Sequence, residues 1–160
     1  MDCAQILSNL HVGSFPRSKE EIDDLLETRR TTAVVNLQSP ADMRRIANFD
    51  RNDMRTHYGI RGIRLFHLPI EDLSTEDLQR RLPDCVLEAL IVSGHSIYLH
   101  CSEGWYRSPT VAVAYLHWSC GWSLKKAEIH VKGQRDCAPD LEAIRLAKPK
   151  TLSRAAKVLA

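Results

Sequence analysis

The chain has 160 residues, 44% of them hydrophobic, so it can bury one sizeable core but is too short for two ordinary domains. Its 22 Lys and Arg residues nearly balance its 20 Asp and Glu residues, which excludes a broad cationic surface for nucleic acid. Five cysteines without a CxxC pair disfavour a disulfide framework and a zinc site, and no apolar run reaches membrane-spanning length. We therefore expect a cytoplasmic, monomeric protein with one domain over residues 1–160 and without a cofactor, a metal, a nucleic-acid partner or a transmembrane segment.

The first part of the chain predicts a strand, a helix and a strand. Residues 10–13 and 33–37 are short apolar runs with β-branched side chains, which are typical of strands. Between them, Ser18 begins a Ser-Lys-Glu-Glu capping signal, and helical periodicity follows to residue 28. Residues 63–68 form the next strand candidate.

The middle of the chain predicts a long helix followed by a buried strand. Residues 75–92 carry apolar side chains at helical spacing, with Ser74 or Thr75 as the candidate N-cap. The pair Ser93-Gly94 is expected to end this helix. The apolar residues 96–100 then predict a central strand.

The remaining elements are helices. Residues 108–118 and 123–131 are helix candidates, separated by Gly121. A last amphipathic stretch covers residues 141–159, with an interruption at Pro149. Strands that alternate with helices predict an α/β fold, in which helices flank a central, mostly parallel sheet.

The strongest chemical signal is the run His-Cys-Ser-Glu-Gly-Trp-Tyr-Arg-Ser at residues 100–108, between the central strand and the next helix. A loop in this position aims backbone N–H groups and the positive end of a helix at one point, which makes an anion site. Gly104 allows the backbone to come close to a ligand, and the planar guanidinium of Arg107 can bind two phosphate oxygens. In this setting Cys101 is expected to act as a thiolate nucleophile.

Hydrolysis of a phosphate monoester also needs an acid that protonates the leaving oxygen. Asp72 is the first candidate, because it follows the third predicted strand and should reach the same sheet edge as Cys101. Glu71 is its competitor in that loop. Ser108 is expected to donate a hydrogen bond to the sulfur, and His100 to orient the loop through its ring nitrogens.

The pattern His-Cys-x5-Arg-Ser, preceded by an aspartate loop, resembles the dual-specificity branch of the protein tyrosine phosphatase superfamily. The opening Ile-Leu-Ser-Asn-Leu-His-Val-Gly-Ser at residues 6–14 is typical of the same branch. Within that branch, residues 77–83 and 137–145 look closest to the glucan phosphatases, which act on starch or glycogen. The resemblance implies a protein tyrosine phosphatase-like dual-specificity fold and a metal-independent reaction through a phosphocysteine intermediate. It also implies the family's catalytic roles for Asp72 and for the loop cysteine and arginine.

The predicted phosphate-binding loop consists of Ser102, Glu103, Gly104, Trp105 and Tyr106. It departs from the glucan phosphatases, which usually carry small or aliphatic residues at several of these positions. Glu103 and Trp105 are similar to the loop of myotubularin-type phosphoinositide phosphatases, in which the loop carboxylate can serve as the acid. Glu103 is therefore a second candidate for the acid, and Trp105 and Tyr106 are candidates for stacking on a sugar or phenyl ring.

The sequence leaves several functions open. The phosphorylated substrate is a glucan, a protein or a phosphoinositide. A catalytically inactive phosphate-binding module is an alternative, although a pure binder would not need a thiolate nucleophile. A rhodanese-like or arsenate reductase-like enzyme is another, although Ser108 and the Asp72 loop favour phosphate chemistry. A regulatory disulfide between Cys101 and a second cysteine is a further possibility under oxidation.

Overall fold

The computed structural model describes residues 1–46, 50–91 and 94–150, in which five strands form a single sheet. The strands are β1 (Cys3–Leu7), β2 (Leu10–Gly13), β3 (Ala33–Asn36), β4 (Arg64–His67) and β5 (Ile97–His100). Their order across the sheet is β1-β2-β5-β3-β4. β1 pairs antiparallel with β2, and every other pair of neighbours is parallel. The prediction of a mostly parallel sheet is therefore confirmed.

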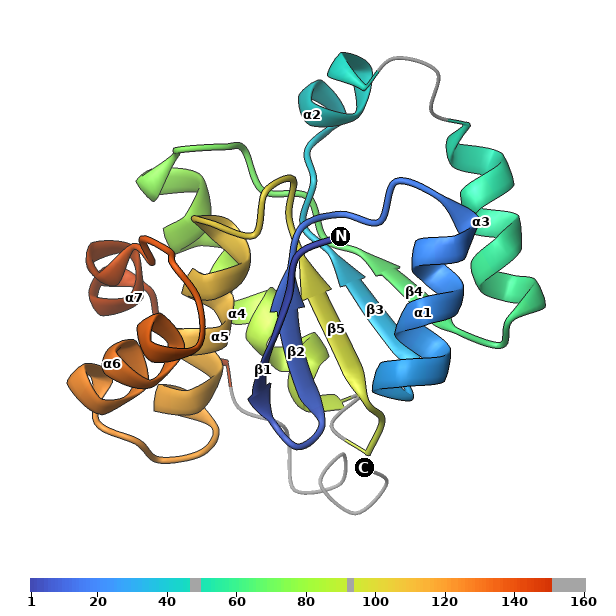
Figure 1. Ribbon diagram of the computed structural model, residues 1–160. Coiled ribbons are helices and arrows are strands. Elements are labelled where there is room, and N and C mark those ends of the chain that lie inside the picture. The colour runs from blue at the N-terminus through green and yellow to red at the C-terminus, as the bar shows by residue number, and fades with distance from the viewer. Residues whose placement is uncertain (47–49, 92–93, 151–160) are drawn as a thin grey trace.

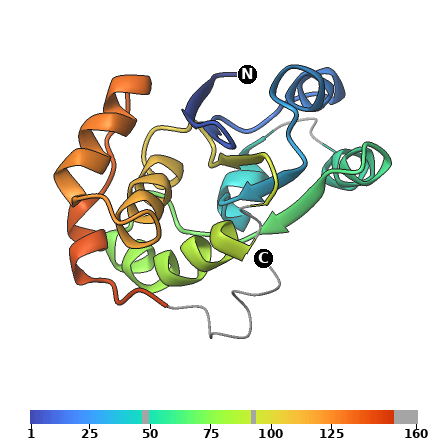
Figure 2. The ribbon, with the colours of Figure 1, turned by 90° about the horizontal axis from the view of Figure 1, so that it is seen from below.

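Helices cover both faces of this sheet. They are α1 (Lys19–Arg29), α2 (Pro40–Arg45), α3 (Arg51–Ile60), α4 (Thr75–Ile91), α5 (Arg107–Trp118), α6 (Leu124–Gln134) and α7 (Leu141–Leu146). α1 and α3 lie on one face, and α4, α5, α6 and α7 lie on the other, as seen along the strands in Figure 2. α2 lies beyond the carboxyl ends of the strands, above the sheet edge in Figure 1. None of the helices in the described ranges has the length and apolar character that a membrane span requires.

The alternation of side chains along the central strands divides the core into two layers. Val34 on β3 and Tyr98 on β5 are fully buried in the layer under α1 and α3. The strand residues on either side of them point into the larger layer under the other helices: Ala33, Val35, Ile97 and Leu99. Because both faces are covered, β3 and β5 are apolar at consecutive positions.

The predicted strands and helices are present, and three further elements were not predicted. β1 is a short edge strand, α2 has six residues, and α3 is largely polar, with Met54 and Tyr58 as buried side chains. In the described part of the predicted stretch 141–159, the helix ends at Leu146, and the nearby Pro149 disfavours helical backbone at the residue before it. Residues 92–93 and 151–159 of the predicted helices lie outside the described residues.

The parallel register aligns the carboxyl ends of the strands. Gly13 and Asn36 both lie opposite His100, and Asn36 also lies opposite His67. The chain segments that follow these four residues therefore meet at one edge of the sheet. One of them is the Cys101 loop, and another is the Asp72 loop.

Candidate active site

Cys101 follows β5 directly, and only 2% of it is exposed. Its Sγ accepts a hydrogen bond from the backbone N–H of Gly104 at 3.2 Å and lies 3.4 Å from the hydroxyl of Ser108. A backbone N–H and a hydroxyl therefore both contact the sulfur. α5 begins at Arg107, and the side chain of the preceding Tyr106 makes no capping hydrogen bond. The first N–H groups of α5 thus remain available to an anion.

Gly104 has a left-handed backbone conformation, with φ of 69°. A Cβ at this position would lie 2.5 Å from the carbonyl carbon of Gly13, so a side chain cannot fit between the loop and the end of β2. Arg135, at the end of α6, donates to the carbonyl of Val12 at 2.8 Å and to that of Glu103 at 3.5 Å. The close backbone contact and the Arg135 side chain together hold the loop against β2.

Arg107 is fully buried at the base of the loop, with 1% of its side chain exposed. Its Nη1 donates to Asp42 Oδ2 at 2.5 Å and to the carbonyl of Ile70 at 2.9 Å. Its Nη2 donates to Asp42 Oδ1 at 3.3 Å and to Ser102 Oγ at 3.2 Å. The guanidinium predicted to bind phosphate is therefore held in place by a buried carboxylate.

Asp42 was not predicted as a site residue, because it lies in the short helix that the sequence analysis missed. Its carboxylate accepts the N–H of Ser39 at 2.8 Å, while Ser39 Oγ accepts the N–H of Asp42, and together they form a capping box at α2. Burial alone would raise the pKa of Asp42, but hydrogen bonds from Arg107 and from the Ser39 backbone hold it below its ordinary value. The signal in the sequence was Ser-Pro-Ala-Asp at residues 39–42, shortly after the second predicted strand.

The structure brings Asp72 to the arginine. Asp72 Oδ1 lies 3.0 Å from Arg107 Nε, and 45% of the Asp72 side chain is exposed. Among the described residues Nε has no aligned hydrogen-bond acceptor, so this contact is an ion pair. Glu71, the competing carboxylate, has an exposed side chain. Its backbone N–H donates to the carboxylate of Asp77 at 2.8 Å, which fixes the loop at the start of α4.

Glu103 lies at the rim of the cleft with its side chain largely in solvent. Its side chain is 70% exposed, and its carboxylate lies 3.8 Å from Arg17, which is itself exposed. A pair in this position is screened by water and holds neither side chain firmly.

The structure separates the two stacking candidates. Trp105 is 46% exposed and lies at the mouth of the cleft, together with Leu73, which is 69% exposed. Tyr106 is half-buried, and its hydroxyl donates to Asp140 at 2.6 Å. Burial, with Asp140 beside it, raises the pKa of Tyr106 to about 12, so the phenol remains a neutral donor. Trp105 is therefore available to a ligand, whereas Tyr106 fastens the loop to the segment before α7.

His100 lies behind the loop and is 2% exposed. Its Nδ1 is 3.1 Å from the carbonyl oxygen of Cys101, so this nitrogen carries the proton and donates. Burial lowers the pKa of His100 to about 4, which keeps the ring neutral near pH 7. The ring therefore holds the Cys101 carbonyl.

Most of the predicted site residues line one cleft with a volume of about 290 Å³, whereas His100, Gly104 and Ser108 are not part of its lining. Its lining consists of Asp72, Leu73, Cys101, Ser102, Glu103, Trp105, Tyr106 and Arg107. All five cysteines are free thiols, and burial raises the pKa of Cys85 to about 12. In the described ranges no three His, Cys, Asp or Glu side chains are arranged to hold a metal ion.

A family model described as the catalytic domain of dual specificity phosphatases matches residues 15–143. Laforin of Mus musculus is 31% identical over 146 residues, which cover 84% of this chain and 44% of laforin. The amyloplastic phosphoglucan phosphatase DSP4 of Castanea sativa is 32% identical over 148 residues, which cover 89% of this chain and 38% of that protein. The chain thus spans less than half the length of these two relatives.

A solved structure supports the same fold. The crystal structure of PTPMT1 has a TM-score of 0.72 to this chain at 20% sequence identity, with 90% of each chain covered. A second crystal structure, of PTPMT1 in complex with PI(5)P, has a TM-score of 0.73. The five-stranded sheet with helices on both faces is therefore the fold of these phosphatases.

Proposed function

The chain belongs to the family of dual-specificity phosphatase catalytic domains, and from that membership we propose that it hydrolyses phosphate monoesters through a phosphocysteine on Cys101. The observation that carries the proposal is the position of the sulfur at the carboxyl end of β5, where it accepts the Gly104 N–H at 3.2 Å. The hydroxyl of Ser108 lies 3.4 Å away from it, and Arg107 lies at the start of the next helix.

Phosphate binding requires Arg107 to exchange some of its partners. Asp42 and the carbonyl of Ile70 hold the guanidinium from buried positions, so we expect them to stay. Ser102 on Nη2 and Asp72 on Nε occupy the remaining edge. A phosphate that binds this edge with two oxygens replaces both contacts, and it releases the Asp72 carboxyl toward the leaving group.

The reaction then proceeds in two displacements. In the first, Cys101 Sγ attacks phosphorus, the bond from phosphorus to the leaving oxygen breaks, and protonated Asp72 gives its proton to that oxygen. In the second, the Asp72 carboxylate takes a proton from a water molecule, which attacks the phosphocysteine. The sulfur–phosphorus bond breaks, and the Ser108 hydroxyl stabilises the departing thiolate. Asp72 is preferred to Glu103 as the acid because Asp72 contacts Arg107, whereas Glu103 extends into solvent.

We propose a phosphoglucan as the first substrate to test. One relative is named a phosphoglucan phosphatase, and the exposed Trp105 and Leu73 offer an apolar rim to the CH face of a sugar ring. A phosphoinositide is the second candidate, because the loop carries both Glu103 and Trp105 and because PTPMT1 has been crystallised with PI(5)P. A phosphoprotein is the third.

The deciding experiment measures phosphate release from phosphorylated amylopectin, a phosphoinositide and a phosphotyrosine peptide at equal phosphate concentration. The Cys101→Ser protein is the blank, and each signal must vanish in it. We expect amylopectin to give the highest rate. A higher rate with the lipid or the peptide reassigns the substrate. Activity retained by Cys101→Ser contradicts the nucleophile, and no release from any substrate by the wild type leaves a phosphate-binding module.

A cytoplasmic monomer is part of the same proposal. One relative is named amyloplastic, so the compartment needs its own measurement. Light scattering of the purified protein and fractionation of the source cells test the two points separately. A dimer or an organelle location would correct them without affecting the chemistry.

A further inference from the structure

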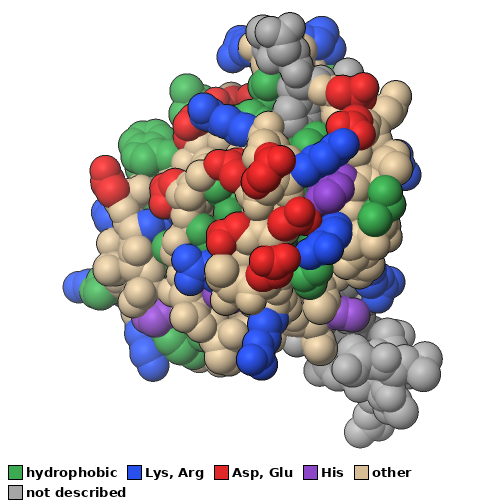
Figure 3. Space-filling model, turned by 45° about the vertical axis from the view of Figure 1, so that its right-hand side comes forward, with side chains coloured by type: hydrophobic (Ala, Val, Ile, Leu, Met, Phe, Trp, Pro, Cys, Tyr) green, Lys and Arg blue, Asp and Glu red, His purple; other side chains and the backbone are tan. Residues whose placement is uncertain are grey.

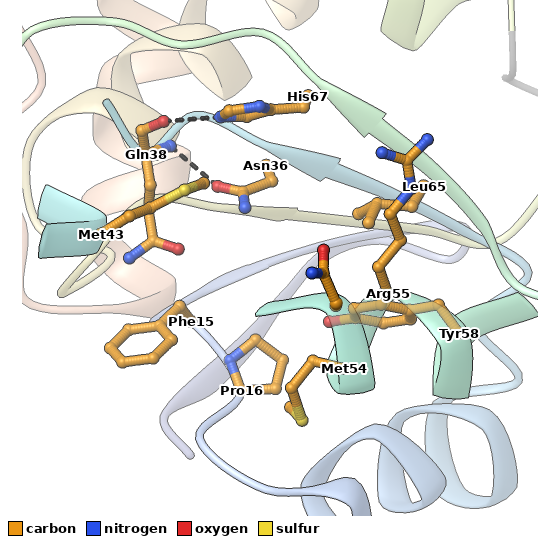
Figure 4. Close-up of a pocket in the computed structure, with 11 residues that line it drawn as sticks. Phe15, Pro16, Asn36, Gln38, Met43, Met54, Arg55, Tyr58, Leu65 and His67 are labelled. Atoms are coloured by element: carbon orange, nitrogen blue, oxygen red, sulfur yellow. Dashed lines mark hydrogen bonds between the residues drawn. The ribbon is translucent and has the colours of Figure 1, made fainter. Parts of the chain in front are cut away.

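A second cavity, of about 370 Å³, lies at the same edge of the sheet as the catalytic cleft. Its walls come from the segment after β2, from β3 and the segment after it, and from α2, α3 and β4 (Figure 4). The volume falls within the range of roughly 300–1,000 Å³ that is typical of ligand pockets. The reaction proposed above uses no residue of this cavity.

A thin wall separates the cavity from the catalytic cleft. Gln38 lines the cavity and is 3% exposed, and its Nε2 lies 3.4 Å from Ser102 Oγ. Phe15 also lines the cavity, and its backbone N–H donates to the carbonyl of Ser102 at 3.1 Å. Ser102 itself lines the catalytic cleft. The contacts of Ser102 with Gln38 and Phe15 therefore form the wall between the two spaces, which are neighbours at one edge of the sheet.

The polar groups of the cavity favour an anion. Arg55 extends from α3 toward β4 in the lining of the cavity (Figure 4), and it forms no ion pair with any residue that the structure describes. Asn36 accepts the N–H of Gln38 through Oδ1 at 2.8 Å, so its amide N–H₂ is the end left for a ligand. Within the described part of the chain, no Asp or Glu lines the cavity. The cavity thus offers a cation and amide donors without a carboxylate to oppose them.

The neighbouring carboxylates are already paired with other cations. Asp23 on α1 contacts His57 at 2.8 Å and Arg61 at 2.9 Å. Asp53 on α3 contacts Lys19 at 2.8 Å. Figure 3 shows acidic and basic side chains side by side on this face of the molecule. These carboxylates therefore do not pair with Arg55, and its charge remains available to a ligand.

The floor of the cavity is apolar. Phe15, Met54 and Tyr58 are each less than 9% exposed and form its base together with Leu65. A low-dielectric floor strengthens the attraction between a cation and an anion above it.

We propose that this cavity binds a second phosphate group, carried by the same substrate molecule as the phosphate that is hydrolysed. No cysteine lines the cavity among the described residues, so a group bound there stays intact. The inference rests on the proposed function only in that the substrate is one that Cys101 attacks. It identifies the preferred substrates as molecules with two phosphate groups a short distance apart.

Binding is tested by NMR on the Cys101→Ser protein, titrated with inorganic phosphate. Asn52 on α3 also lines the cavity, so we expect the side-chain amides of Asn36 and Asn52 to shift in addition to the backbone amides of residues 102–108. Arg55→Gln should weaken phosphate binding at the cavity about tenfold, which is about 1.4 kcal/mol, and leave the loop affinity unchanged. Arg145→Gln is the matched control, because Arg145 is an exposed arginine on α7, far from the cavity in the fold. The proposal is overturned if the side-chain amide signals of Asn36 and Asn52 do not shift with phosphate. It is also overturned if Arg55→Gln and Arg145→Gln lose phosphate affinity equally.

The source of the second phosphate is tested by comparing glucose 6-phosphate with glucose 1,6-bisphosphate. We expect tighter binding of the bisphosphate to Cys101→Ser, with the gain lost in Arg55→Gln and retained in Arg145→Gln. Equal affinity for the two sugars, with free phosphate still bound in the cavity, contradicts a shared substrate. If only the amides of residues 102–108 fail to respond, the proposed catalytic function fails while the cavity stands.

Discussion

At the scale of single residues, Arg107 has two kinds of partner. Asp42 and the carbonyl of Ile70 hold the guanidinium from inside the protein, whereas Asp72 and Ser102 occupy the edge that faces the cleft. Each kind of contact has a different role in the proposed reaction. The inner contacts fix the arginine, and the outer contacts are given up when phosphate binds.

The outer contact predicts opposite effects of Asp72→Asn on binding and turnover. Loss of the carboxylate that competes for Arg107 should tighten binding of inorganic phosphate severalfold. Loss of the acid should lower kcat by about 100-fold or more, most for poor leaving groups. Phosphate titrations and a series of aryl phosphates measure both. Glu103→Gln is the comparison, and a larger kcat loss in that variant would make Glu103 the acid.

The inner contact predicts a stability effect of Asp42→Asn. A buried arginine that loses its carboxylate should lower the free energy of unfolding at pH 7 by about 3 kcal/mol and raise KM. Because the folded pKa of Asp42 lies below its unfolded value, its contribution is present above about pH 4 and is lost as pH falls through the folded pKa. Urea unfolding should therefore show a larger stability difference between the wild type and Asp42→Asn at pH 7 than at pH 3. Asp53→Asn, which removes an exposed pair, should change the stability much less than Asp42→Asn does.

His100 predicts a second pH effect of a different origin. The unfolded chain takes up a proton at His100 near pH 6.5, whereas burial delays this in the folded protein to about pH 4. The free energy of unfolding should therefore decrease as the pH is lowered from about 6.5 to about 4, by up to about 3 kcal/mol from this residue. Denaturant unfolding across this pH range measures the slope, and His100→Gln should flatten it. An unchanged slope would show that His100 is not the group that titrates.

At the scale of elements, the helix N-caps and the alternation of strands with helices could be predicted from the sequence, whereas the short elements could not. Ser18 accepts the N–H of Glu21, and Ser74 accepts that of Asp77, at the starts of the two helices predicted from these signals. α2 is six residues long and α3 is polar, so both depend on tertiary contacts more than on an apolar stripe. Because α2 was missed, Asp42 was missed with it.

The loop at the end of β5 depends on its close contact with β2, and Gly104→Ala tests this. The left-handed φ and the 2.5 Å approach to the Gly13 carbonyl carbon leave no room for a methyl group. We expect the loop to shift, kcat/KM to fall at least about 100-fold, and stability to fall by about 1–3 kcal/mol. Gly59→Ala, at a glycine with open space around it, is the control. Normal activity in Gly104→Ala would mean that the contact is not needed.

At the scale of the whole molecule, the order of the strands explains which residues could be predicted together. Asp72, Cys101 and Arg107 follow predicted strands, and parallel strands place such segments at one edge. The contacts of Asp42 and the cavity beside Gln38 depend on how distant segments pack over that edge. Side-chain packing of this kind leaves no periodic pattern in the sequence.

The two carboxylates on Arg107 also bear on how a substrate reaches the protein. With Asp42 at 2.5 Å and Asp72 at 3.0 Å, the guanidinium is largely neutralised before any anion approaches. Long-range attraction of an anion to the catalytic site is then weak. Salt screens such attraction beyond a Debye length of about 10 Å at 0.1 M, so added salt has little attraction to reduce. We expect kcat/KM for a singly phosphorylated substrate to change little with ionic strength. Encounter with this site is therefore governed by diffusion and fit, and a steep fall in added salt would instead point to steering by cations elsewhere on the surface.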